Sequence, residues 1–117
     1  MENYLQAAML YDFYGELLTE KQKNVFEMYY QNDMSLSEIA DEMSISRQGV
    51  RDQLKRTEKL LMEYEEKLKL VEKFNEQKKL VKSILEIINK IENETPLPSN
   101  MVKEFENIKN ISENILK

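Results

Sequence analysis

The segment from Ser46 to Leu60 gathers side chains that can bind an anion. Its charged residues sum to +3, with five basic residues and two acidic ones: Arg47, Arg51, Lys55, Arg56, Lys59, Asp52 and Glu58. The chain as a whole has 117 residues and a net charge of −5, so the rest of it carries −8. A basic patch on an acidic body attracts phosphate at one place and repels it elsewhere, which favours a local nucleic-acid site.

Helical spacing brings these side chains to one side of a helix that begins near Ser46. Val50, Leu54 and Leu61 would face inward, and the opposite side would be polar. Arginine can pair with guanine and glutamine with adenine, and base edges are usually read near the start of such a helix. The residues predicted to bind nucleic acid are Arg47, Gln48, Arg51, Asp52, Lys55, Arg56 and Lys59. The alternative is that they form only a solvated helix face.

Other chemistry has little support in the composition. The chain has no histidine and no cysteine, which excludes Ser-His-Asp and Cys-His nucleophiles, zinc sites with nitrogen or sulfur ligands, and disulfides. Glu63, Glu65 and Glu66 point in different directions on a helix, so paired acid-base work is not expected. We therefore expect no enzyme, no metal and no cofactor.

The element that would position the basic face is a helix-turn-helix. Ser35 with Glu38 forms a capping box that starts a short helix, and Ser46 is the N-cap of the next one. Between them the turn holds Ser44, and Ile45 fills the gap beneath it. Ala40 is small enough for two helices to cross closely.

Two more helices are expected before this motif. Leu5, Met9, Phe13 and Leu17 recur every four residues and predict the buried face of a first helix. Thr19 with Gln22 is a capping box that starts a second. Only two glycines and two prolines occur in the chain, which favours an all-α protein over a turn-rich β fold.

The segment after Leu61 is predicted to be a helical extension, so that the domains are residues 1–61 and 62–117. Its apolar stripe is interrupted by the polar stretch 75–79, where the chain either bends or exposes one turn of a long helix. Pro96 and Pro98 end that helix, and a last amphipathic helix follows. The extension would either fold back as a hairpin on the first domain or form a seam with a second chain. We favour a homodimer, because helix-turn-helix proteins commonly pair to read two half-sites.

No run of apolar residues reaches the roughly 18 that a membrane helix needs, and Glu2 with no basic cluster does not suit a secretory signal. We expect no membrane contact and a cytoplasmic location.

Residues 18–61, which include LSEIADEMSISRQGVRDQL, resemble region 4 of sigma factors. Together with the following EYEEKLKL, about the first 70 residues in all, they resemble the YlxM family of small bacterial helix-turn-helix proteins. The resemblance implies a sigma-like recognition helix that uses Arg47, Gln48, Arg51, Asp52 and Lys55.

It also implies a DNA-binding regulator connected with the signal recognition particle, because the family's genes often neighbour those of that particle. Two residues depart from the sigma pattern. Ser44 stands where the turn usually has glycine, and a non-glycine residue in a left-handed conformation costs on the order of 1 kcal/mol. Asp52 places an anion on a surface meant for phosphate. The alternative is an adaptor that binds a component of the signal recognition particle and no longer reads DNA.

Overall fold

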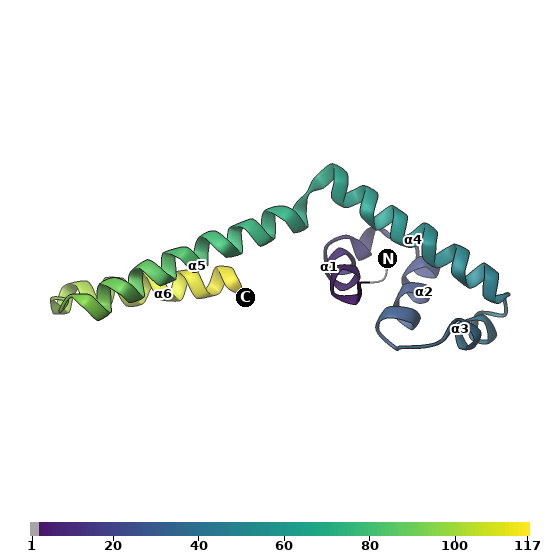
Figure 1. The fold of residues 1–117 in the computed structure, drawn as a ribbon, viewed down its shortest axis with the longest axis horizontal. Helices are drawn as coiled ribbons and strands as arrows, with labels where there is room; N and C mark the ends of the chain where they lie inside the picture. The colour runs from purple at the N-terminus through teal and green to yellow at the C-terminus, as the bar shows by residue number, and fades with distance from the viewer. Residues whose placement is uncertain (1–2) are drawn as a thin grey trace. The chain divides into compact units, whose positions relative to one another are not determined.

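The computed structural model describes residues 3–117, and all of its secondary structure in that range is helical (Figure 1). The elements are α1 (Tyr4–Tyr14), the 3-10 turn η1 (Gly15–Leu17), α2 (Glu20–Tyr30), α3 (Leu36–Met43), α4 (Arg47–Leu68), α5 (Leu70–Glu94) and α6 (Ser99–Leu116). This confirms the all-α class. The chain divides into an N-terminal unit that ends at Val71 and a C-terminal unit that begins at Glu72.

The helix starts lie where their capping residues predict them. Thr19 and Gln22 form a complete capping box at α2, and Ser35 and Glu38 form one at α3. At α4 the Ser46 hydroxyl accepts the amide of Gly49 at 3.0 Å. Each cap satisfies backbone groups that a helix end leaves without partners, which is why these starts could be read from local sequence.

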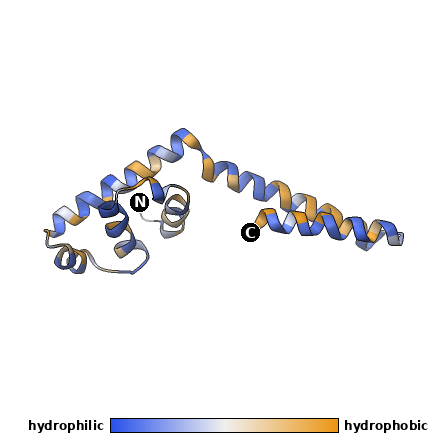
Figure 2. Cartoon of the chain, turned by 180° about the vertical axis from the view of Figure 1, so that it is seen from behind, coloured by the Kyte–Doolittle hydropathy of each residue, from blue (hydrophilic) through white to orange (hydrophobic). Residues whose placement is uncertain are grey.

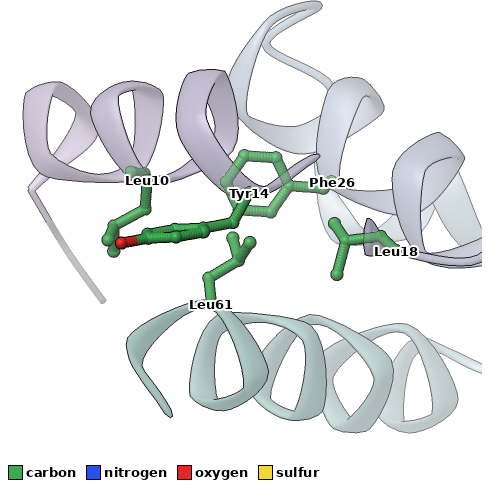
Figure 3. Close-up of a cluster of buried hydrophobic side chains, with 6 residues drawn as sticks. Leu10, Tyr14, Leu18, Phe26 and Leu61 are labelled. Carbon is green, nitrogen blue, oxygen red and sulfur yellow. The ribbon is translucent and has the colours of Figure 1, made fainter. Parts of the chain in front are cut away.

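The N-terminal unit encloses two groups of buried side chains. One joins α1, α2 and α4 through Leu10, Tyr14, Leu18, Phe26 and Leu61 (Figure 3). The other joins α2, α3 and α4. Because α2 and α4 contribute to both groups, these two helices hold the unit together.

The predicted buried face of α1 is wrong. Leu5 is 76% exposed and Leu17 is also exposed, whereas Ala7, Leu10 and Tyr14 are buried. With 100° per residue, Leu5 and Met9 lie on the opposite side of the helix from Ala7, so the spacing of four residues identified the wrong side. Of the predicted residues, Phe13 is partly buried against the core.

A break in the helical path comes at Lys69, between α4 and α5. Lys69 has a left-handed backbone, with φ 54° and ψ 33°. The Tyr14 hydroxyl donates to Glu65 at 2.5 Å and accepts the amide of Leu70 at 3.1 Å, and Glu65 also accepts the amide of Val71 at 3.0 Å. These bonds satisfy the first amides of α5, which the sequence did not predict. The polar stretch 75–79 instead lies within continuous α5.

In the C-terminal unit, α6 returns alongside α5 after the turn that contains Pro96 and Pro98 (Figure 1). An ion pair between Lys109 and Glu92, with the shorter Nζ to oxygen distance at 2.6 Å, joins the two helices. The Glu92 hydrogen bond raises the pKa of Lys109 above its usual value. No helix in the described range combines the length and the apolar character needed to cross a membrane.

Candidate nucleic-acid interface

Helix α4 is mounted on α2 and α3 by a small buried core. Val25, Ile39, Ala40, Val50 and Leu54 pack together there, and Ile45 of the turn packs against them. Their core role was predicted for Ala40, Ile45, Val50 and Leu54, and the burial confirms it. The first turns of α4 are therefore held at a set angle to α3, which is the arrangement of a helix-turn-helix.

The turn between α3 and α4 passes through Ser44 in a left-handed conformation, with φ 57° and ψ 42°. The amide of Ile45 donates to the Ala40 carbonyl at 3.1 Å and so closes the end of α3. A serine in this left-handed conformation is less favourable than a glycine by on the order of 1 kcal/mol.

The basic side chains of α4 are available to a ligand. Arg47, Arg51, Lys55, Arg56 and Lys59 are all exposed. Within the part of the chain that the structure describes, none of these five is tied to a carboxylate or to another hydrogen-bond acceptor. Their charge is thus not neutralised internally.

These side chains spread around roughly half of the helix. With 100° per residue, Gln48, Asp52, Lys55 and Lys59 lie opposite the buried row of α4. Arg47, Gln48 and Arg51 line one shallow hollow at the start of the helix. Arg51 also lines a second hollow with Tyr29 and Leu36, which places it toward α2 and α3.

Gln48 and Asp52 bind each other. The Gln48 side-chain nitrogen donates to Asp52 Oδ1 at 3.0 Å, and Asp52 is half-buried. This bond leaves the Gln48 amide oxygen and the second carboxylate oxygen of Asp52 as the neutral and anionic acceptors in the middle of the face. Both can accept from an amino group of a base.

The other acidic residue of this segment, Glu58, is engaged from α2. The Tyr30 hydroxyl donates to Glu58 at 2.5 Å. Burial, followed by the bond to Glu58, raises the pKa of Tyr30 above its usual value. Glu58 is thereby held beside α2.

Lys21 is a basic residue that the sequence reasoning missed. It lines a hollow with Arg56, Gln53 and Thr57, at the first turn of α2. Lys21 thus extends the basic surface from α4 onto α2. Its position two residues after the predicted N-cap Thr19 was the available signal, but nothing in the sequence relates that turn to Arg56.

Gly49 was open to two interpretations, close approach of phosphate or packing. A Cβ atom at this position would lie 3.2 Å from the Ser46 hydroxyl oxygen and 3.6 Å from Ile45 Cδ1. The packing interpretation has this direct support, because a side chain would press on the cap of α4.

Comparison with known proteins identifies similar chains. A family model described as a helix-turn-helix protein, YlxM / p13 like, matches residues 1–108. A UPF0122 protein of Caldanaerobacter subterraneus is 55% identical over 87 residues, which is 74% of each chain. A UPF0122 protein of Bacillus pumilus is 50% identical over 88 residues, 75% of this chain and 80% of the other. One from Bacillus cereus strain AH187 is 47% identical over 92 residues, 79% and 84% of the two chains. The family match extends beyond the first 70 residues, through α5 and into α6.

Proposed function

The chain belongs to the YlxM / p13-like family of helix-turn-helix proteins, and from this premise we propose that it is a non-enzymatic, nucleic-acid-binding regulatory protein of the cytoplasm. The observation that supports the proposal most is the set of unpaired cations on a rigidly mounted α4. The ligand is DNA or RNA, bound through the helix that starts after Ser46.

Binding begins with phosphate. Arg47, Arg51 and Lys55 neutralise backbone phosphates and release the counterions that surround them. The charge of −8 on the rest of the chain opposes other docking orientations. Gln48 and Asp52 then lie where they can contact bases, and Arg56 and Lys59 extend the backbone contacts along α4.

We include a homodimer in this proposal. Two copies would place two α4 helices on one nucleic acid and double the number of phosphate contacts. Helix-turn-helix proteins commonly place the second helix of the motif in the major groove, so a DNA target would be read there by α4.

The second candidate is a protein adaptor of the signal recognition particle. The Gln48–Asp52 hydrogen bond favours it, since one base-reading side chain is occupied and an anion sits in the middle of the face. The link to the signal recognition particle rests only on the gene neighbourhood of the family.

Salt dependence separates the two candidates. We expect fluorescence anisotropy with labelled duplex DNA and labelled RNA to show binding whose log affinity falls with log salt, at near 0.9 for each neutralised phosphate, which gives a slope of about −3 for one protomer and about −5 for a dimer with both α4 helices bound. The double variant Arg47→Ala, Arg51→Ala should reduce the slope to about a third of the wild-type value.

The matched control is Lys82→Ala, Lys103→Ala, which removes the same charge from exposed positions of α5 and α6. Its slope should equal that of the wild type. The adaptor is favoured if both double variants reduce the slope equally, or if the wild type binds neither DNA nor RNA at low salt.

A further inference from the structure

A row of apolar side chains lies open on the α5–α6 hairpin. Its members are aliphatic, and each is between 38% and 61% exposed: Leu80, Ile84, Ile87, Ile91, Ile108, Ile111 and Ile115. Figure 2 shows hydrophobic colour on both helices of this hairpin. We refer to these seven residues as the open apolar face.

The two helices present these residues on the same side. In α5 each of them directly precedes a less exposed residue of the row that faces α6: Val81, Leu85, Ile88 and Glu92. In α6 each directly precedes one of Lys109, Ser112 and Leu116, which face α5. A step back of one residue turns by 100° around a helix. Because α6 runs antiparallel to α5, these two turns lead to the same side of the hairpin.

The opposite side of the hairpin is different in character. It carries Lys82, Glu86, Asn89, Asn93, Glu106, Asn110 and Glu113, with Val102 as its one apolar exception among the large exposed residues there. The exposed isoleucines are therefore confined to one side of the hairpin. A soluble monomer rarely leaves a contiguous apolar patch of more than a few hundred Å² open to water.

The spacing of the open apolar face suits a helical bundle. Steps of four, three and four residues in α5, and of three and four in α6, are the heptad spacing of a coiled-coil seam. Each helix also has a second row of residues at this spacing, which faces the other helix of the hairpin. A helix with two adjacent rows contacts two neighbours, as every helix of a four-helix bundle does.

The size and the charge of the face suit a second copy. Seven half-exposed aliphatic side chains present on the order of 400 Å² of apolar surface. A standard interface covers about 500 Å² of apolar surface on each partner. The outer border along the middle of the face, with Ser83, Lys90, Asn107 and Asn114, is mostly uncharged, and the two rows end in Glu94 and Glu104 near the turn of the hairpin. A two-fold axis that places the two turns at opposite ends keeps these glutamates apart, so two copies would meet without strong repulsion.

We infer that the open apolar face binds the same face of a second copy, so that two α5–α6 hairpins form a four-helix bundle. This specifies the interface of the homodimer, and rests on that part of the proposed function alone. It does not require that the protein bind nucleic acid.

Sedimentation velocity of the full chain tests the inference. The wild type should sediment as a dimer at micromolar concentration. In the double variant Ile87→Glu, Ile111→Glu each copy would bury two carboxylates in an apolar contact, which should raise the dimer dissociation constant about a hundredfold or more. The matched control Asn89→Glu, Asn110→Glu adds the same charge to the opposite side and should remain a dimer.

A second measurement covers the case in which the glutamate variant unfolds, which far-UV circular dichroism would reveal. The chain has no cysteine, so Ile111→Cys and Asn110→Cys each provide a single thiol. A short bismaleimide should join two copies of Ile111→Cys and leave Asn110→Cys unlinked. A monomeric wild type, a dimer that survives the glutamates in a folded variant, or equal linking of both cysteine variants overturns the inference. A wild-type dimer that binds neither DNA nor RNA upholds it and defeats the nucleic-acid proposal instead.

Discussion

The two units of the molecule treat their apolar side chains in opposite ways. In the N-terminal unit one row of large side chains on each of α1, α2 and α4 is enclosed, and Tyr14, Phe26 and Leu61 are almost inaccessible to water, although Leu5, Met62 and Leu68 are exposed. In the C-terminal unit only Val81 and Ile88 among the large apolar residues are buried, and most of the isoleucines remain open. The difference is that the first unit has a closed core of its own, whereas the second unit buries few large apolar side chains, which is the observation behind our proposal that it binds a second copy.

The two units also differ in the side-chain hydrogen bonds that join their helices. Three tyrosine hydroxyls of the N-terminal unit donate to glutamates: Tyr11 to Glu27, Tyr14 to Glu65 and Tyr30 to Glu58. Each links residues at least 16 positions apart. They fix helices relative to one another, which a mount for a binding helix requires. In the C-terminal unit, the Lys109–Glu92 ion pair joins α5 and α6.

The largest expected effect is that of Leu61→Ala. It removes a fully buried side chain beside Tyr14 and Phe26 and should lower the free energy of unfolding of the N-terminal unit by about 2–5 kcal/mol. Urea denaturation followed by tyrosine fluorescence measures this, because all six tyrosines lie between Tyr4 and Tyr64. Ile87→Ala at the open apolar face is the counterpart, and in dilute protein it should change the free energy of unfolding of the C-terminal unit, followed by far-UV circular dichroism, by less than about 0.5 kcal/mol. Equal losses would remove the contrast between the units.

Tyr14→Phe should come next. The change deletes the hydroxyl that donates to Glu65 and accepts from Leu70, at a cost of about 1.5–3 kcal/mol for a hydrogen bond to a charged group. Urea denaturation again measures the loss. Tyr64→Phe is the control, since its ring lies 6.0 Å from that of Tyr14 but its hydroxyl has no hydrogen bond in the described structure. A similar loss in both variants would mean that the Tyr14 hydroxyl has no special role.

Thr57→Val tests the closed core of the N-terminal unit with a variant that should stabilise it. The Thr57 hydroxyl is buried and has no hydrogen-bond partner, so replacing it by a methyl group of similar shape should stabilise the unit by about 1 kcal/mol. Thr57→Ser keeps the hydroxyl and loses the methyl group, and it should be less stable than the wild type. A less stable Thr57→Val variant, measured in the same urea experiment, would contradict this account of the buried hydroxyl.

The smallest expected effect is a pH dependence at α3. Hydrogen bonds from the Ser35 backbone and side chain lower the pKa of Glu38 below 4.5. Because the folded-state pKa is the lower one, the stabilisation is present above the unfolded value and is lost as the pH falls through the folded value. Thermal denaturation between neutral pH and the carboxyl range measures it. Glu38→Gln keeps an acceptor for the cap and should lack this part of the pH dependence, so an identical pH profile in both proteins would be the contrary result.

What could be predicted from the sequence was mostly local. The capping residues Thr19, Ser35 and Ser46 define helix starts within three residues of themselves, and all three act as predicted. The left-handed conformation of Ser44 was implied by the family resemblance, because the sigma-type turn usually has glycine at this position. The helix-turn-helix was recognisable because its whole signal lies within about twenty residues.

What could not be predicted depends on distant partners. Leu10 and Tyr14 are buried because Leu61 of α4 covers them, and that contact spans some fifty residues. Lys69 breaks the helix where Tyr14 and Glu65 bind the first amides of α5, so no property of Lys69 itself announces it. In the hairpin, whether Ile88 or Ile87 faces α6 depends on a rotation of one residue, which the shared apolar stripe does not define.

An NMR titration of isotope-labelled protein with duplex DNA tests the central claim most directly. The account predicts that amide shift changes centre on residues 46–59, with smaller changes near Lys21, and that the open apolar face of α5 and α6 is unaffected. Changes that centre on α5 and α6, or no changes at low salt, would contradict the assignment of α4 as the nucleic-acid-binding helix.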